Sequence, residues 1–585
     1  MVKLSDYFAH MLSTRAVDTV FGYQGSSVSH LIDSLSRHER ISFVETRHEQ
    51  AAAFAANGYA LASGKMGVAL SCSGPGATNL ISGIANAYYD SLPCLFLTGQ
   101  VSVREMKTDR DMRQLGFQET DVVSLVKPIT KYAVTIEQPD QIAYELEKAM
   151  FMMLDGRPGP VLLDIPHNIQ GSEVDPSILH HFTPHKSLTA TVRIETAAAQ
   201  TALQFMHSCK PVILLGGGSR ALKQKPELIK FLCNLGIPIV SSYRGKDVID
   251  NHIPSYCGTL GVYGDRCANW AIKYCDYLLV LGSRLDGRQT GDGQESFAPN
   301  TKVTVVDLDP VELRNMPDRY IKINENVTNF ISVLLTCTIQ FSTHNTWLDL
   351  IQQWRMRYSD EQEYHITEQV NPNLLLKRIS AFAAPDAIFS VDVGQNQLWA
   401  NTSLRVGEGQ HLLQSCGLGA MGFALPAAIG GYYSGKKQAI CICGDGGFQM
   451  NLQELQTAIS YHIPLKIFIL NNQSLGLIRV YQDKALGKRH FGSVIGFGSP
   501  DYQQLAKAYG IRYAKICNNE FAQTLAMIFS SPETYLVEVL VSPHSTNYPE
   551  PTYLSTIDNQ SKELSAEEKK RVMEEAYGIT SKKQQ

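Results

Sequence analysis

One strand–turn–helix–strand pattern in the last third of the chain constrains its fold more than any other stretch. The apolar run Ala439–Cys443 predicts a buried strand, and the glycine-rich turn 444–447 follows it directly. Residues 450–461 carry apolar side chains at helical spacing, and 465–470 predict a second buried strand. A helical connection between two buried strands predicts parallel pairing. The carboxyl ends of both strands should therefore meet at one edge of an α/β sheet.

Polar residues follow both of these predicted strands. Asp445 comes after the first, and Asn472 comes after the second, 27 positions later. Carboxylate and amide oxygens suit Mg²⁺, which takes its remaining ligands from phosphate and water. Gly446 and Gly447 would let backbone N–H groups approach a phosphate at the start of the helix. A Gly-Asp-Gly turn alone is common, and the paired asparagine is what favours a metal–diphosphate site over a simple turn.

The size and charge of the chain exclude several classes of protein. With 585 residues, of which 44% are hydrophobic, we expect several domains with ample core. A net charge of −4 argues against a primary role in nucleic-acid binding. Twelve scattered cysteines form no CxxC pair, which indicates free thiols in a reducing compartment. No apolar run is long enough for a membrane span and no signal peptide is recognisable, so we expect a cytoplasmic protein without a membrane partner.

Alternating helix and strand patterns predict an α/β fold with three domains, each a parallel sheet flanked by helices. Their expected bounds are 1–175, 190–340 and 365–550, followed by a polar C-terminal tail at 551–585. Pro176–Lys186 reads as a linker.

Two helices are expected outside the domains. Trp347, Leu350 and Trp354 mark one linking helix within the polar stretch 338–368. Ser565–Glu568 has capping-box spacing, which predicts a short solvated helix near the C-terminus.

The first and third domains show a weak internal repeat at an offset of 371 residues. The coinciding positions are Gly64-Lys65 with Gly435-Lys436, Gly74 with Asp445, and Pro93 with Pro464. In both places a strand leads into a glycine-rich turn, a helix and a proline-led strand. The two domains should therefore share a fold. Glu49 falls opposite Ala420, so the two copies are chemically specialised.

Glu49 is a candidate catalytic acid. It lies at the start of an alanine-rich helix expected at 48–62, whose close packing would place the carboxylate in apolar surroundings that favour proton exchange near neutrality. The alternative is an exposed acid at a helix start that interacts with the helix dipole. His48-Glu49 lacks the second histidine of HExxH, which excludes a zinc protease of that type.

Three further glycine-containing stretches are candidate ligand loops. Gly417–Gly422 matches GxGxxG, but scarcely a strand precedes it, so we favour close backbone approach to a cofactor over a dinucleotide fingerprint or a buried helix entry. Gly282–Gly291 follows a strand and carries two arginines, and Val305–Pro310 ends in acids. Arginines recognise phosphate or carboxylate, and an acid at a strand end holds a ribose in many sheets. Surface salt bridging is the alternative for both.

With these motifs in place, the chain resembles the acetolactate synthase branch of thiamine diphosphate enzymes, from about residue 3 to 545. The resemblance rests on Phe21–Gly25, Arg47–Gln50, Ser73–Asn79, Gly116–Glu119, Arg157–Pro160, Asp392–Gln395, Gly417–Gly422, Gly444–Gly446 and Asn471–Gln473. It implies that thiamine diphosphate and Mg²⁺ are bound, and that FAD is bound as a structural cofactor. The family places its catalytic glutamate and its diphosphate site on different subunits, which implies a homodimer or homotetramer.

The resemblance also implies roles for single residues. Glu49 would bond the pyrimidine ring of the coenzyme, and Met421 would prop the coenzyme in a bent shape. The catalytic residues implied are Glu49 and Gln118; the metal ligands are Asp445, Asn472 and Ser474. The coenzyme contacts implied are Pro75, Asn79, Gly394, Gln395, Gly419, Met421, Asp445, Gly446, Gly447, Asn472 and Ser474. FAD contacts would be Arg157, Gly217, Gly218, Gly282, Arg284, Asp286, Arg288 and Asp307. Gly25, Phe117, Arg284, Leu477 and Tyr481 would line the substrate pocket.

The sequence departs from this family pattern at several positions. Gln24 replaces a proline, and Ser26 and Cys416 replace glycines. At 476–481 the chain reads Gly-Leu-Ile-Arg-Val-Tyr where the family has Gly-Met-Val-x-Gln-Trp, and that tryptophan shapes the pocket for the second substrate.

The resemblance implies decarboxylation of a 2-oxo acid such as pyruvate, followed by ligation onto a second carbonyl. The altered pocket leaves transfer onto a keto-sugar nucleotide open, as well as decarboxylation or flavin-linked oxidation without ligation. A non-catalytic scaffold is disfavoured because Glu49, Asp445 and Asn472 are all present.

Overall fold

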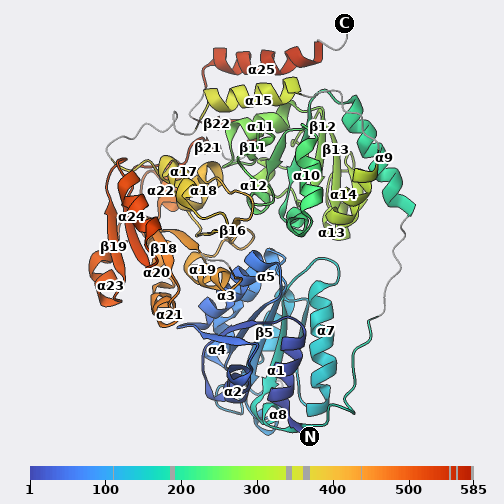
Figure 1. The fold of residues 1–585 in the computed structure, drawn as a ribbon, viewed down its shortest axis with the longest axis vertical. Coiled ribbons are helices and arrows are strands. Elements are labelled where there is room, and N and C mark those ends of the chain that lie inside the picture. Colours follow the sequence, from blue (N-terminus) through green and yellow to red (C-terminus); the bar gives the residue numbers. More distant parts are fainter. Residues whose placement is uncertain are drawn as a thin grey trace.

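The fold was analysed in a computed structural model, which describes residues 1–109, 111–184, 192–337, 345–359, 369–435, 438–551, 555–561 and 564–581. Three six-stranded sheets lie within these ranges, and every pairing inside them is parallel. The expected α/β class with three sheet domains is therefore confirmed (Figure 1). Lys186, Lys436 and the segments 338–344 and 360–368 lie outside the described residues.

The N-terminal sheet has the strand order β3-β2-β4-β5-β7-β6. Its strands are β2 Thr19–Gly22, β3 Ser42–Glu45, β4 Gly67–Ser71, β5 Cys94–Gln100, β6 Tyr132–Thr135 and β7 Val161–Pro166. Its longer helices are α1 Leu4–Thr14, α2 Ser29–Arg37, α3 Glu49–Ser63, α5 Ile81–Tyr89 and α7 Ile142–Leu154, and the single turn α4 Pro75–Asn79 follows β4. One core cluster gathers α1, α2 and α7 on one face of the sheet, and another gathers α3 and α5 on the other.

The C-terminal sheet has the equivalent order β16-β15-β17-β18-β20-β19. Its strands are β15 Ile388–Val391, β16 His411–Gln414, β17 Ala439–Gly444, β18 Leu465–Asn471, β19 Arg512–Ile516 and β20 Tyr535–Leu540. Its helices include α17 Pro372–Phe382, α18 Gln395–Ser403, α19 Ala424–Tyr432, α20 Asp445–Gln449, α21 Leu455–Ser460, α22 Gly476–Ala485, α23 Tyr502–Ala508 and α24 Ala522–Ser530. Moving β5 along the chain by 371 positions reproduces the bounds of β18. The repeat inferred from a few coincidences is thus a shared topology.

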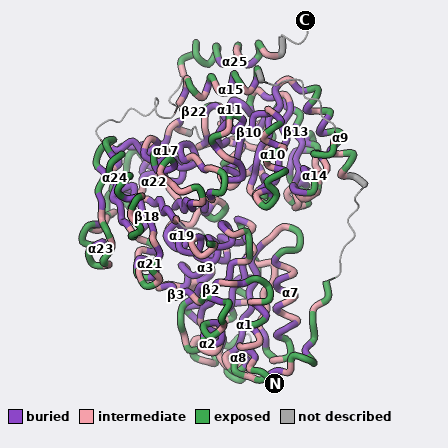
Figure 2. Tube along the Cα trace, viewed as in Figure 1, coloured by how far each residue is buried: buried purple, intermediate pink, exposed green. Residues whose placement is uncertain are grey.

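The two related domains contact each other through equivalent helices, α3 and α19. A Cβ built on Gly58 would lie 2.3 Å from the carbonyl oxygen of Ala427, and one on Gly430 would lie 1.8 Å from that of Ala55. Both contacts are backbone to backbone, so only glycine fits at either position. The alanine-rich composition of α3 therefore serves this close helix crossing, and Figure 2 shows α3 and α19 buried at the junction of the two domains.

The central sheet has the order β11-β10-β9-β12-β13-β14. Its strands are β9 Pro211–Leu215, β10 Ile239–Ser241, β11 Tyr256–Thr259, β12 Tyr277–Leu281, β13 Lys302–Asp307 and β14 Ile321–Asn324. Its helices are α9 Val192–His207, α10 Pro226–Asn234, α11 Arg266–Tyr274, α12 Gly287–Thr290, α13 Pro310–Arg314 and α14 Val327–Thr336. In Figure 1 the central sheet lies at the upper end of the molecule and the N-terminal domain lies at the lower end.

Two predicted helices are embedded more deeply than expected. The linking helix α15, Asn345–Arg357, buries Trp347 and Trp354 in the core of the central domain. The C-terminal helix α25, Ala566–Ser581, packs on α15 and buries Val572 and Ala576 (Figure 1). The expected helix is present and mostly exposed, but it is longer than expected and one apolar face of it completes that core. Its capping box does form, with Ser565 and Glu568 exchanging hydrogen bonds.

The helix predicted at 450–461 is broken. The chain becomes helical at Asp445 in α20, leaves the helix at Asn451, and resumes through the turn η7 Leu452–Glu454 into α21. Asn451 has φ −138 because its side chain turns away to bond Gly422 and Gln50. The break places several polar side chains against the N-terminal domain.

No helix in the described parts of the chain is long and apolar enough to cross a membrane. All twelve cysteines are free thiols.

A buried acid in β7 makes stability pH-dependent. Burial raises the pKa of Asp164 to about 7, although Thr98, Gln100 and Thr135 donate hydrogen bonds to it. The folded chain therefore keeps a proton that the unfolded chain releases above its ordinary pKa of 3.8. The contribution of this bound proton to the free energy of unfolding is fully present below about pH 4 and is lost as the pH rises to about 7.

Asp164→Asn cannot ionise, so its melting temperature relative to wild type should rise with pH. Between about pH 5 and 7.5 the change should correspond to on the order of 2 kcal/mol in the variant's favour. Thermal unfolding of both proteins across this range measures it. Parallel pH curves would contradict the buried, protonated carboxyl.

Candidate functional site

The predicted metal residues lie at adjacent strand ends. Strands β17 and β18 pair in parallel with Gly444 opposite Leu470. Asp445 therefore follows one strand at the edge where Asn472 follows the other. The predicted juxtaposition arises directly from this register.

Asp445 is a buried carboxylate with no cationic side chain among its described hydrogen-bond and ion-pair partners. Its side chain accepts hydrogen bonds from the backbone N–H groups of Gly446, Gln473 and Ser474, with the first at 3.0 Å. Burial nevertheless outweighs these bonds and raises the pKa of Asp445 to about 6. A bound cation would reverse this cost, because it favours the ionised carboxylate.

Neighbouring polar atoms complete a set that suits Mg²⁺ and a diphosphate. The amide nitrogen of Asn472 donates to Gln395 Oε1 at 2.9 Å, and Asn472 Oδ1 accepts from Ser474 N at 3.2 Å. The hydroxyl of Ser474 is buried and has no hydrogen-bond partner among the residues that the structure describes. Gly394 has φ +123 ahead of α18, a conformation that suits glycine. These oxygens, with the N–H groups at the start of α20, match the chemistry of a metal–diphosphate pair.

Asp392 connects the turn that carries Met421 to the glycine-rich turn 444–447, which we call the metal turn. The buried Asp392 carboxylate accepts from the backbone of Val393, Gly422 and Ala424 at 2.9–3.0 Å. A Cβ on Gly447 would lie 2.7 Å from Asp392 Oδ1, and one on Gly446 would lie 3.5 Å from the Met421 methyl. Met421 therefore lies beside the glycine turn that follows β17. Gly419 adopts φ +70 within the same turn.

Glu49 lies in the N-terminal domain at the start of α3. Its side chain is 8% exposed, and Oε2 accepts from Asn79 Nδ2 at 3.0 Å. A Cβ on Gly76 would lie 3.2 Å from Oε1, so the turn after β4 packs closely over the carboxylate. The structure therefore brings Glu49 and Asn79 together and buries the acid. The exposed-acid interpretation of Glu49 does not apply.

Other predicted N-terminal residues surround the same turn. Pro75 opens α4, and a Cβ on the preceding Gly74 would lie 2.9 Å from that of Gln118. Gln118 itself has φ +66. Gly25 packs against the Cys72 side chain, while Phe117 is 86% exposed.

Leu477 and Tyr481 lie four residues apart on α22, which starts directly after the metal-site residues. Tyr481 is 45% exposed, and the intervening Arg479 is buried and donates to the carbonyl of Ser545 at 2.8 Å. Within one chain, Phe117 and Tyr481 are therefore exposed residues rather than parts of a closed pocket.

No hydrogen bond or ion pair between described residues joins Glu49 to Asp445, Asn472 or Ser474. The candidate acid and the predicted metal residues occupy separate domains of the chain, each with its own set of contacts.

The predicted flavin residues share one cavity of about 1620 Å³ between the three domains. All eight contribute to its lining: Arg157, Gly217, Gly218, Gly282, Arg284, Asp286, Arg288 and Asp307. Arg157 bonds Asp309 and Glu312, and the Arg288 guanidinium lies 5.6 Å from the centre of the Tyr263 ring. Close glycine packing shapes the floor, where a Cβ on Gly218 would lie 3.0 Å from Gly282 Cα.

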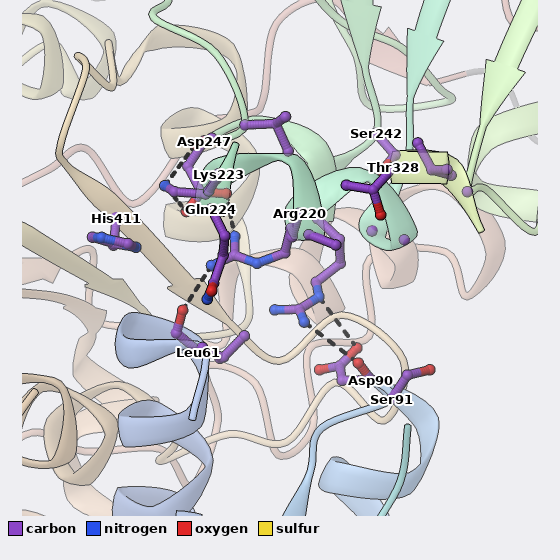
Figure 3. A pocket seen from close by; sticks show the side chains of 18 of the residues that line it. Leu61, Asp90, Ser91, Arg220, Lys223, Gln224, Ser242, Asp247, Thr328 and His411 are labelled. Carbon is purple, nitrogen blue, oxygen red and sulfur yellow. Dashed lines mark hydrogen bonds and ion pairs between the residues drawn. The ribbon is translucent and has the colours of Figure 1, made fainter. Parts of the chain in front are cut away.

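A buried ionic cluster that sequence reasoning missed closes one wall of this cavity (Figure 3). Asp247 pairs with Arg220 and Lys223, and it accepts from Leu412 N at 3.0 Å. Burial alone would raise the pKa of Asp247, but the two cations hold it below its ordinary range. Arg220 also donates to the carbonyl of Leu61 at 2.8 Å, so the cluster joins all three domains.

Comparison with known proteins agrees with this geometry. Three family models match in order: the thiamine pyrophosphate enzyme N-terminal TPP binding domain at residues 2–125, the central domain at 199–334 and the C-terminal TPP binding domain at 392–539. The chain belongs to the thiamine pyrophosphate enzyme family. The three models also follow the order of the three sheets.

Curated relatives resemble the chain along nearly its whole length. The acetolactate synthase large subunit of Cyanidium caldarium is 35% identical over 92% of this chain and 93% of its own. The isozyme 2 large subunit of Escherichia coli is 34% identical over 92% and 95%, and the Lactococcus lactis large subunit is 35% identical over 91% of each chain. This thiamine pyrophosphate enzyme is thus similar to acetolactate synthase large subunits from end to end.

Several residues that shape the site of this thiamine pyrophosphate enzyme were not predicted as functional. Asp392 was noticed only as part of a motif, and Asp247 and Glu454 were not noticed at all. The partners of these acids include backbone N–H groups of residues distant in sequence. Only the buried setting of each acid, between apolar strands or helices, signals such a role.

Proposed function

We propose that the protein decarboxylates a 2-oxo acid, with pyruvate as the first candidate, and ligates the resulting two-carbon unit to a second carbonyl compound. The reaction would depend on thiamine diphosphate and Mg²⁺. One observation carries this proposal: the similarity to acetolactate synthase large subunits spans more than nine-tenths of the chain. The burial of Glu49 and the adjacent strand-end positions of Asp445 and Asn472 support it.

The residues of the C-terminal domain would bind the coenzyme. Asp445, the Asn472 side chain and the Ser474 carbonyl would hold Mg²⁺, while Gly394, Gln395, Gly446 and Gly447 would contact the diphosphate. When bound, the thiazolium ring supplies an electron sink for the loss of CO₂. Met421 would help to hold that ring in position.

Glu49 would hold and exchange a proton at the pyrimidine ring. Its near-complete burial, with Gly76 packed over it, excludes water from the carboxylate. Asn79 fixes the direction of one carboxylate oxygen. Both features favour a proton shared with the coenzyme rather than with solvent.

We place each active site between two protomers. Glu49 shares no hydrogen bond with Asp445 within one chain, and Phe117 and Tyr481 are exposed beside the two half-sites. A second copy of the chain would cover these side chains and bring its acid to the partner's metal turn. A homodimer or homotetramer provides this arrangement. The free thiols support a reducing location, which we propose to be the cytoplasm.

The large cavity between the domains supports bound FAD. Arginines suit its diphosphate, the Gly217–Gly218 turn follows a strand, and Asp307 at the end of β13 suits a ribose. Since three domains form its walls, the flavin would act structurally. Purified protein should therefore show the visible absorption of a flavin.

Arg288→Ala should weaken FAD binding about 10- to 100-fold, since it removes a charge-assisted contact. Arg319→Ala is the matched control, because Arg319 belongs to the same domain but binds the carbonyls of Phe297 and Glu295 away from the cavity. Titration of flavin-free protein with FAD measures both. Equal affinities for Arg288→Ala and wild type would contradict this site.

One observation favours a second acceptor. Tyr481 stands where similar enzymes have the tryptophan that shapes the acceptor pocket, and the residue is 45% exposed. A keto-sugar nucleotide would suit a wider, more polar pocket than a small 2-oxo acid.

Incubation with pyruvate, thiamine diphosphate and Mg²⁺ tests the proposal. Acetolactate would support it, whereas acetaldehyde or acetyl phosphate would identify decarboxylation or oxidation without ligation. Release of CO₂ that increases only when a keto-sugar nucleotide is added would establish the second acceptor. Absence of CO₂ from every 2-oxo acid would contradict both.

A further inference from the structure

The segment that carries Glu49 is held by the opposite domain of the same chain. Residues 45–50 run from β3 into α3, and three side chains from the segment after the metal turn contact them. The Glu45 N–H donates to the Tyr461 hydroxyl at 2.8 Å, and the Asn451 amide donates to Gln50 Oε1 at 3.2 Å. Between these two contacts lies Glu454.

Glu454 accepts several hydrogen bonds, including bonds from the backbone of residues 45–50. Its side chain is fully buried, and its two oxygens accept from the Arg47 N–H at 3.0 and 3.1 Å. The Thr457 hydroxyl donates to Glu454 at 2.7 Å, and the His48 N–H also donates to it. Burial raises the pKa of Glu454 to about 7, so ionising this carboxyl group at the domain junction costs free energy. A buried acid of this kind needs a structural reason.

The position of these contacts supplies that reason. His48 is the N-cap of α3 and Glu49 is its first residue. Backbone N–H groups at a helix start lack partners within the helix, and the residues that bind them set the direction in which the helix begins. Glu454 therefore acts on the two peptide units that precede the catalytic acid. It makes no described hydrogen bond to the Glu49 side chain itself.

The same segment also reaches the coenzyme turn. Asn451 donates to the Gly422 carbonyl at 2.9 Å, next to Met421, and the segment follows α20 after Asp445. A contact network thus runs from the metal turn through residues 451–454 to the peptide units before Glu49.

We propose that Glu454 is a positioning residue for Glu49, which aligns the carboxylate by holding the backbone of Arg47 and His48 against the segment that follows the metal turn. The proposal rests on the proposed function, in which Glu49 exchanges a proton with the coenzyme. Loss of this alignment should slow proton exchange without preventing coenzyme binding.

Glu454→Gln tests it, because glutamine keeps the shape but replaces one of the two acceptor oxygens with an N–H donor. Backbone amide exchange in coenzyme-free protein should become faster in residues 45–50. In protein loaded with thiamine diphosphate and Mg²⁺, exchange of the thiazolium C2 proton into D₂O, read by NMR after acid quenching, should slow about 10- to 100-fold. Coenzyme affinity should change less than threefold.

Tyr461→Phe is the matched control, since it removes a different hydrogen bond to this segment, four residues before Glu49. Its C2 exchange should stay within about twofold of wild type. Wild-type C2 exchange in Glu454→Gln would overturn the positioning role, as would an equal loss in Tyr461→Phe. If wild-type protein itself fails to speed C2 exchange over free coenzyme, the proposed function fails, while amide exchange still tests the contact.

Discussion

Replacing Glu49 with glutamine is expected to lower turnover about 100- to 10,000-fold while the protein still binds thiamine diphosphate and Mg²⁺. Positioned proton transfer contributes this much to the rate of many enzymes, and glutamine keeps the shape of the side chain but cannot exchange the proton. The hydrogen bond from Asn79 can still reach the remaining oxygen. Steady-state rates with pyruvate and calorimetric titration with coenzyme measure the two effects separately.

Glu45→Gln is the control for this variant. Glu45 belongs to the same segment, but it is part-exposed, and its one ion pair among the described residues is with Arg47, at 3.8 Å. Its removal should change turnover less than threefold. Full activity of Glu49→Gln, or loss of coenzyme binding in that variant, would show that the buried acid has another role.

Replacing Asp445 with alanine is expected to weaken binding of thiamine diphosphate in the presence of Mg²⁺ at least about 100-fold, which corresponds to about 2.7 kcal/mol. Asp445 is the charged member of the proposed ligand set, and Mg²⁺ has few protein ligands to spare. The coenzyme-free variant should melt no lower than wild type, because burial raises the pKa of Asp445 and makes its charge costly without a metal.

Asp501→Ala provides the matched comparison within the same domain. Asp501 caps α23 through Gln504 N at 3.0 Å and lies outside the proposed ligand set. Its loss should cost stability but leave coenzyme affinity unchanged. An Asp445→Ala protein that binds the coenzyme with wild-type affinity would rule out the proposed metal site.

The sequence predicted those parts of the molecule that depend on local patterns. The run Ala439–Cys443, its glycine-rich turn and the strand before Asn472 have the periodicity of a buried β–α–β unit, so the meeting of Asp445 with Asn472 followed from strand register. The repeat at 371 residues followed from the same local patterns. Its true extent, an identical strand order in both sheets, required the structure.

Features that depend on contacts between distant segments were not predictable. Glu454 reads as an ordinary polar residue of an amphipathic helix, yet it is fully buried against Arg47, about four hundred positions away. The helix break at Asn451 has the same cause. The burial of one face of α25 was not predicted, because most of its residues are polar. Its few apolar residues are buried only through packing against α15 and the central core.

Hybrid dimers test the central claim, that one protomer supplies the acid and its partner supplies the metal turn. Glu49→Gln and Asp445→Ala chains, each inactive alone, would be coexpressed with different affinity tags, and the doubly tagged hybrid would be assayed. If each site uses Glu49 of one chain and Asp445 of the other, one of the two hybrid sites is intact, and activity per dimer should return to roughly half of wild type. If both residues serve one site within a single chain, every site carries a lesion, and a hybrid as inactive as its parents would contradict the account.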